Sequence, residues 1–439
     1  MKTLEHQLDW FQNRIQDSRP IEKIGRVVQV TGLIIESEGP EVSLGDVVEV
    51  YSHRRDFSVQ SEVVGFRDNR VLLMPLGEMK DIHAGCRVIS SSITDAVPVG
   101  ETLKGRVIDG LGNPIDSGAA LRSEHVTGVE GRPPNPMKRQ RIENIFQTGV
   151  KSIDSFIPLG QGQRMGIFAG SGVGKSVLMG MIARYSEADI NVISLVGERG
   201  RELREFIEND LGPEGLERSI IVVSTSDQPA PLRLRAALMA TRIAEYFRDQ
   251  GQKVLYLMDS VTRLAMAQRE IGLAVGEPPT SRGYTPSVFS LLPRLLERAG
   301  SGEQGSITAL YTVLVEGDDL NDPISDAVRS IVDGHIVLDR ELATANHFPA
   351  VDILSSVSRL ARDLCTEEEV QGISDARDLL SLYRKNEDLI NIGAYKKGSN
   401  ARIDKAIKKH EVLMDFLRQR PHESISRPEC MQKLLELLK

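Results

Sequence analysis

Cysteine is scarce in this sequence, and no part of it is apolar over a long stretch. Cys86, Cys365 and Cys430 are far apart and odd in number, which argues against a disulfide framework and against a zinc site. No apolar run reaches the roughly 18 residues that a membrane-spanning helix requires. The first residues include acidic side chains and lead into no apolar segment, so we expect no secretory signal peptide. These absences favour a protein of the reducing cytoplasm, whose contact with any membrane would be peripheral.

An excess of basic charge is absent as well. The 54 lysines and arginines are outnumbered by 62 acidic residues, and the net charge of -8 argues against a broad surface for nucleic acid. We therefore expect no nucleic-acid partner, with a local basic groove as the open alternative. At 439 residues, 40% of them hydrophobic, the chain is long enough for two or three folded domains.

The first segment, residues 1–24, is predicted to contain a short amphipathic helix. Leu4, Leu8, Phe11 and Ile15 recur at helical spacing and would form one apolar stripe. Two interpretations of this stripe are open. It could pack against the next domain of the same chain, or it could dock on a partner protein.

Short strand-forming runs separated by glycine-bearing turns fill residues 25–95 and predict a small antiparallel β-barrel. A strand entering a tight turn is expected at 105–114, and a proline-rich linker at 131–136. The barrel runs lie at 26–35, 46–51, 62–66 and 70–74.

Residues 96–364 are predicted to form an α/β domain with a largely parallel sheet, because buried apolar strands there alternate with helical segments. The expected strands are 164–169, 192–196, 220–224, 254–258, 307–315 and 334–338. Residues 365–439 contain few strand formers, and the helical periodicity of 403–418 and 430–438 predicts a small helical C-terminal domain.

A glycine-rich loop between the strand at 164–169 and the following helix has the pattern of a phosphate-binding P-loop. Glycines let the backbone turn sharply, so that successive N–H groups and the helix N-terminus can point at phosphate oxygens. We expect ATP as the ligand, with Lys175 on the β- and γ-phosphates and Ser176 on Mg²⁺. Ala169 replaces the usual first glycine. The loop residues are Gly170, Ser171, Gly172, Val173, Gly174, Lys175, Ser176 and Val177.

Two carboxylates follow predicted strands of the α/β domain and would complete a hydrolytic site. Asp259 ends the run 254–258 and matches the second Mg²⁺-holding element of a P-loop enzyme, although an Asp there could also simply cap a turn. Glu198 follows the strand 192–196 and is placed to act as the general base for the attacking water. Its alternative is an ordinary salt bridge with Arg199.

The order of these elements, with GRVIDGLGN at 105–113 and EGDDLNDP at 316–323, resembles the rotary ATP synthase catalytic-subunit superfamily over about residues 25–365. Within it, PMKRQRI at 136–142, GERGRE at 197–202, AMAQREI at 265–271 and GEPP at 276–279 are similar to the type III protein-export ATPases. The tail segments IGAY at 392–395 and GSN at 398–400 favour the flagellum-specific members. The injectisome ATPases are nearly as similar.

This resemblance implies a RecA-like core, a β-barrel before it, a helical domain after it and a homohexameric ring. It implies that Lys175 binds the phosphates and that Ser176 binds Mg²⁺. It also implies that Glu198 is the catalytic glutamate and that Asp259 holds Mg²⁺ through water. Arg359, in SVSR at 356–359, matches an arginine finger that acts on the neighbouring subunit's nucleotide, so hydrolysis should depend on assembly.

The resemblance also implies partners. Phe348 stands where the family places an aromatic ring against adenine, although simple core packing would explain it equally well. The loop at 276–287 would face a coiled-coil stalk protein in the ring pore, or would be a plain connection. The N-terminal helix would bind a stator or regulator of the export apparatus, and the ring would receive chaperone–substrate complexes at the membrane export gate.

Other functions compete with flagellar export. An injectisome ATPase would share nearly every motif. A rotary ATP synthase subunit would share the core, but Glu198 argues against a non-catalytic one and the export-type segments argue against the rest. An RNA-translocating hexameric helicase would also join a small barrel to this core, but residues 25–90 are not markedly basic and offer few aromatic platforms for single strands.

Overall fold

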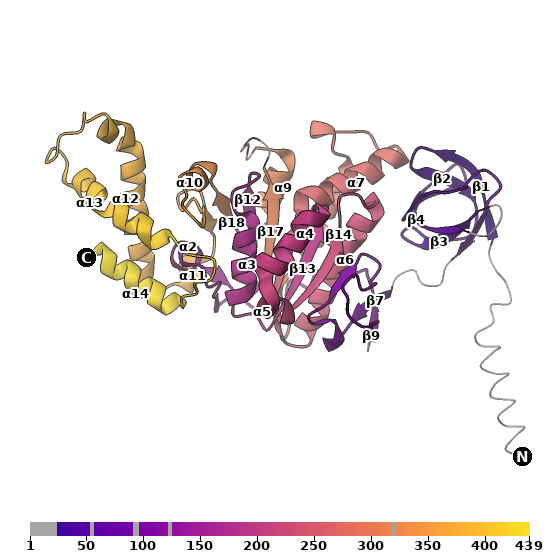
Figure 1. The fold of residues 1–439 in the computed structure, drawn as a ribbon, viewed down its shortest axis with the longest axis horizontal. Coiled ribbons are helices and arrows are strands. Elements are labelled where there is room, and N and C mark those ends of the chain that lie inside the picture. Colours follow the sequence, from indigo (N-terminus) through magenta and orange to yellow (C-terminus); the bar gives the residue numbers. More distant parts are fainter. Residues whose placement is uncertain are drawn as a thin grey trace, which may run out of the picture. The chain divides into compact units, whose positions relative to one another are not determined.

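The computed structural model describes residues 24–52, 57–90, 96–121, 125–315, 317, 319 and 321–439. The amphipathic helix predicted for the N-terminal segment lies outside these residues. The chain forms two compact units (Figure 1). One contains the described residues before Ala96 together with Leu273–Glu277, and the other contains Ala96–Gly272 and Pro278–Lys439. Each unit is described by itself.

The first unit is a closed antiparallel barrel with the strand order β1-β2-β5-β4-β3-β6. Alternate side chains such as Val59 and Val63 of β4 point inward and are buried. The run at 26–35, expected as one strand, is a hairpin, because Gly32 with a φ of 57° turns the chain between β1 and β2. The strands are β1 Ile24–Thr31, β2 Ile34–Glu38, β3 Val47–Tyr51, β4 Ser58–Arg67, β5 Arg70–Pro75 and β6 Arg87–Ser90.

The second unit is built on a nine-stranded sheet with the order β19-β18-β12-β17-β15-β13-β14-β8, and β16 pairs with β17 off this path. The pairings from β18 through to β8 are all parallel. The six strands predicted from the sequence are all present. The strands are β8 Val107–Asp109, β12 Arg164–Ala169, β13 Ile190–Val196, β14 Ser219–Ser224, β15 Lys253–Asp259, β16 Gly300–Ser301, β17 Ser306–Leu314, β18 Gly334–Leu338 and β19 Val357–Ser358.

Helices cover both faces of this sheet, so that successive residues of a strand enter different cores (Figure 1). Ile193 and Leu195 of β13 belong to a buried cluster that also includes residues of α2, α3 and the C-terminal helices, whereas Val192 and Val196 belong to a second cluster with residues of α6 to α9. The helices are α2 Lys151–Phe156, α3 Lys175–Tyr185, α4 Gly200–Glu205, α5 Gly212–Glu217, α6 Ala230–Asp249, α7 Val261–Val275, α8 Pro286–Leu296, α9 Pro323–Ile331, α10 Arg340–Thr344 and α11 Ala361–Leu364.

Short elements complete this unit. Two small antiparallel sheets pair β7 Ala96–Val99 with β9 His125–Gly128, and β10 Ile145–Phe146 with β11 Leu159–Gly160. The short helical turns are η1 Glu101–Leu103, η2 Phe206–Leu211 and η3 Ser281–Gly283.

Three longer helices, α12 Glu367–Asn391, α13 Ala401–Leu417 and α14 Arg427–Leu438, form the C-terminal region. Thr366 and Glu369 close a capping box at the start of α12, and Arg427 binds Glu369 at 2.8 Å to join α14 to it. The predicted architecture of barrel, parallel α/β core and helical C-terminal region is therefore confirmed. Within the described part of the chain, none of the helices has both the length and the apolar character that a membrane crossing requires.

A buried ion pair fastens α6 to the segment after α8. The guanidinium of Arg298 donates to both carboxylate oxygens of Glu245, at 2.7 and 2.8 Å, and neither side chain exceeds 4% exposure. Arg242 also donates to Glu245, at 3.1 Å. This bidentate geometry offsets the desolvation of both charges.

Replacing Glu245 by Gln should lower the free energy of unfolding by about 3–5 kcal/mol, because Arg298 would remain as an uncompensated buried cation. Urea unfolding followed by far-UV circular dichroism measures this loss. The matched control is Glu429→Gln, whose pair with Lys433 is exposed, and it should change the free energy by less than about 1 kcal/mol. Similar losses in the two variants would contradict the assignment.

Candidate nucleotide site

The predicted P-loop joins β12, which ends at Ala169, to α3, which begins at Lys175. Gly172 and Gly174 have φ angles of 78° and 87°, in the left-handed region where a side chain would be strained. No described side chain caps α3, so the first N–H groups of the helix face the loop. This is the backbone geometry of an anion site.

The side chains predicted for hydrolysis gather at the carboxyl ends of neighbouring parallel strands. The ammonium of Lys175 donates to Asp259 at the end of β15, and it lies 3.8 Å from Oε1 of Glu198, which follows β13. The hydroxyl of Thr312, on β17, which flanks β15 on the side away from β13, donates to Asp259 at 2.7 Å. Sheet order therefore assembles a cation and two carboxylates whose side chains are no more than 16% exposed.

The protonation of Glu198 is altered by this setting. Burial and the nearby Asp259 carboxylate raise the pKa of Glu198 to about 7 from a usual value of 4.5, although the Lys175 ammonium opposes the rise. A carboxylate that titrates near neutral pH is suited to accept a proton from water.

Mg²⁺ fits the chemistry of the residues present. Ser176 is exposed at the start of α3 and offers a hydroxyl, and Asp259 offers a carboxylate, so both donors are oxygens. Among the described residues no cluster of three or more His, Cys, Asp or Glu side chains could hold a metal alone. Mg²⁺ bound with a nucleotide needs no such cluster, because phosphates and water fill the rest of its coordination.

A cavity of about 710 Å³ opens beside these groups, large enough for a nucleotide. Three arginines from different parts of the fold line this cavity: Arg199 before α4, Arg263 of α7 and Arg340 of α10. The acidic residues Glu202, Glu205 and Asp210 also line it. The other lining residues are Ala169, Gly170, Ser171, Gly172, Gly174, Lys175, Ser176, Val177, Glu198, Thr262, Met266, Leu314, Val315 and Gly317.

The two remaining predicted residues occupy different places. Phe348 is 40% exposed, and its ring would lie 3.3 Å from a Cβ on Gly174, so it stands against the end of the P-loop. Arg359 is exposed and does not line the cavity. Its backbone N–H donates to the carbonyl of Asp333, and its guanidinium donates to the carbonyl of Arg329, both at 3.1 Å.

Sequence reasoning missed two contributors to the site. Thr312 binds Asp259, but its strand also contains the hydroxyl residues Ser306, Thr308 and Tyr311, so nothing in the sequence singled it out. The strand order that places β17 beside β15 is not visible in the sequence. Arg263 lines the cavity from the first turn of α7, where its only signal is its place just after Asp259.

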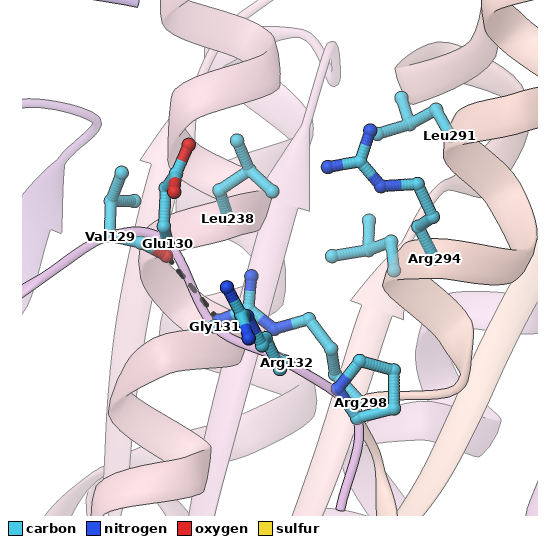
Figure 2. A pocket seen from close by; sticks show the side chains of 10 residues that line it. Val129, Glu130, Gly131, Arg132, Leu238, Leu291, Arg294 and Arg298 are labelled. Atoms are coloured by element: carbon cyan, nitrogen blue, oxygen red, sulfur yellow. Dashed lines mark hydrogen bonds between the residues drawn. The ribbon is translucent and has the colours of Figure 1, made fainter.

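A second cavity, of about 580 Å³, lies against α6, α8 and the linker after β9 (Figure 2). Leu238 and Leu291 supply an apolar wall beside Arg294. Arg298 there is already neutralised by Glu245 and donates to the carbonyl of Val129 at 3.4 Å. This second cavity is lined by none of the residues predicted for nucleotide binding.

Comparisons with known proteins agree with this geometry. Residues 149–358 match the nucleotide-binding domain of the ATP synthase alpha/beta family, and residues 27–91 match the beta-barrel domain of that family. Residues 365–436 match the T3SS EscN ATPase C-terminal domain.

Individual relatives cover nearly the whole chain. The "Flagellum-specific ATP synthase" of Bacillus subtilis is 55% identical over 95% of both chains. The "Type 3 secretion system ATPase" of Xanthomonas euvesicatoria is 49% identical over 95% of this chain and 93% of that protein. The assembled ATPase EscN of the enteropathogenic E. coli type III secretion system superposes with a TM-score of 0.88, at 43% identity over 94% of this chain and all of that one. With these relatives and this site, the chain belongs to the family of flagellum-specific ATP synthases and type III secretion ATPases, and it is an ATPase.

Proposed function

We propose that this ATPase energises type III export of flagellar proteins, releasing substrates from their chaperones at the export gate. The observation that carries the hydrolytic part is the carboxylate of Glu198, 3.8 Å from the P-loop Lys175 and with a pKa raised to about 7. The flagellar part is supported by relatives named "Flagellum-specific ATP synthase" at 44% to 55% identity.

The residues divide the work of phosphoryl transfer to water. Lys175 exchanges its contact with Asp259 for the β- and γ-phosphates, while the loop N–H groups hold the remaining phosphate oxygens. Ser176 and Asp259 are the residues that would hold Mg²⁺. When bound, Mg²⁺ neutralises charge on the phosphates. Glu198 orients the attacking water and accepts its proton at a carboxylate oxygen.

Assembly completes the site in this proposal. Arg359 is exposed and absent from the lining of its own subunit's cavity, as expected of a finger that serves the neighbouring subunit of a homohexamer. The relative EscN has been solved as an assembled ATPase, which supports a ring. Phe348, beside Gly174, is proposed to stack on adenine.

Partner surfaces are also proposed. EscN has been solved with its central stalk EscO, which supports a stalk contact for the loop at 276–287. In this chain Arg282 of that loop pairs with Asp319 at 2.7 Å and with Asp322 at 3.0 Å, which fixes one side of the loop. The N-terminal segment is proposed to bind a stator or regulator, and the protein to work in the cytoplasm, in peripheral contact with the membrane export gate.

An injectisome role is the second candidate. It is favoured by the match of residues 365–436 to the EscN C-terminal domain and by the Xanthomonas relative. Because this region is shared by both systems, the choice between them depends on the partners rather than on the catalytic residues.

Changing Glu198 to Gln should lower the steady-state hydrolysis rate by about 10² to 10⁴-fold while the Kd for ATP changes little, because the amide keeps its size but cannot accept the proton. Phosphate release and fluorescent-nucleotide titration measure the two quantities. Glu208→Gln, on the exposed pair with Arg204, is the control and should hydrolyse ATP normally. Hydrolysis that survives Glu198→Gln would remove this residue as the base.

The pH dependence of kcat/KM should show an acid limb near pH 7. Glu198 acts only as a carboxylate, and its raised pKa of about 7 means that the active form is lost as the pH falls through that value. A profile from about pH 5.5 to 9 tests this, and the residual activity of Glu198→Gln should lack the limb. A profile that stays flat down to the acid end of this range would show that the pKa of Glu198 is not raised from its usual value of 4.5 in solution.

The export role makes a prediction for cells. In the source organism, replacement of the natural chain by the Glu198→Gln variant should stop flagellar proteins from reaching the medium, and the tagged variant should co-purify with flagellar export components. Co-purification with components of a virulence secretion system would favour the injectisome role instead. A second, different ring subunit in the complex would indicate a rotary synthase.

A further inference from the structure

Gln163, the residue before β12, is fully buried and connects three backbone segments. Its Oε1 accepts a hydrogen bond from the N–H of Gly160 at 2.8 Å. Because an N–H can only donate, this bond fixes the orientation of the amide. The Nε2 group therefore faces the other side, where it donates to the carbonyl of Asp333 at 3.1 Å and to the hydroxyl of Ser358 at 3.2 Å.

Asp333 is held from several directions at this point. Arg164 donates to its carboxylate through the backbone N–H, Nε and a terminal nitrogen, each at 3.1 Å. The backbone N–H of Asp333 donates in turn to the carbonyl of Arg164 at 2.8 Å. The carbonyl of Asp333 then accepts the N–H of Arg359 at 3.1 Å, as well as the amide of Gln163. One fixed carbonyl thus holds the backbone of Arg359.

The segment that carries Arg359 is also held upstream, where buried Ser356 hydrogen-bonds to Val337, Asp352 and Arg377, but it has little other support between Ser356 and Arg359. β19 is two residues long and pairs with β18 at only two positions, Gly334 with Ser358 and His335 with Val357. The guanidinium of Arg359 has one hydrogen bond within the described part of the chain, to the carbonyl of Arg329. The direction in which the exposed side chain leaves the surface is therefore set by its backbone.

We propose that Gln163 is a positioning residue for Arg359, fixing Ser358 and Asp333 on one amide so that the arginine projects toward the neighbouring subunit. This inference rests on the proposed role of Arg359 in trans. The same strand, β12, links the two sites: Gln163, which holds the backbone around Arg359, directly precedes it, and the P-loop follows it. The strand is six residues, or about 20 Å, long.

The test uses mixtures of two inactive subunits. Gln163→Leu keeps an intact P-loop but loses the amide, and we expect its hydrolysis to fall by about 10²-fold with the Kd for ATP unchanged. Lys175→Ala has a defective P-loop but an intact Arg359. When the two full-length chains are assembled together at equal concentration, about half of the Gln163→Leu subunits should receive an intact arginine from a neighbour, and hydrolysis should recover.

The control mixture separates this inference from the function on which it rests. Arg359→Ala alone should lose about 10³ to 10⁵-fold, and mixing it with Lys175→Ala should also restore hydrolysis. Failure of this control would overturn the role of Arg359 in trans. Recovery in the control without recovery for Gln163→Leu would overturn the positioning role, because it would place the defect in the Gln163→Leu subunit's own nucleotide site.

Two further measurements decide the matter if Gln163→Leu assembles poorly. Ser358→Ala removes one acceptor from the amide at a less buried position and should give a smaller loss that is likewise recovered by mixing. In the Arg359→Ala background, Gln163→Leu should cause no additional loss, because its target is already absent. Equal losses with and without Arg359 would show that Gln163 acts on something else.

Discussion

The ammonium of Lys175 is the charge on which the catalytic arrangement depends. It stands between the carboxylates of Asp259 and Glu198 at the ends of β15 and β13. Two buried carboxylates so close together repel each other, and without a cation one would take up a proton or turn toward solvent. Because phosphates compete for the same ammonium, nucleotide binding changes the electrostatic surroundings of both carboxylates at once.

The C-terminal helices share this core with the sheet. Ile373 of α12 and Leu413 of α13 pack in the same cluster as Leu178 of α3, the helix that begins at the P-loop. Gln419 donates to the carbonyls of Gly149 and Glu423, and its backbone N–H binds the carbonyl of Phe348. The predicted boundary between residues 364 and 365 stays a prediction, but the helical region is fastened beside the proposed adenine contact.

Much of the fold could be predicted because buried parallel strands read as continuous apolar runs, as β13 and β14 do, and because the P-loop has a strict local pattern. Glu198 and Asp259 could be found because carboxylates at strand ends stand out against such runs. The contacts of Thr312 and Gln163 could not, since they depend on which strands are neighbours. The hairpin at Gly32 was missed because the apolar pattern continues through its turn.

β12 also has a direction, and this matters in the proposed ring. In that ring its amino end, with Gln163, would belong to the side that serves the next subunit, and its carboxyl end, at the P-loop, would belong to the subunit's own nucleotide. A displacement of the strand on phosphate binding would therefore be felt by the neighbour on one side and not by the neighbour on the other. Repeated around the proposed closed ring, this polarity would make the two neighbours of every subunit inequivalent.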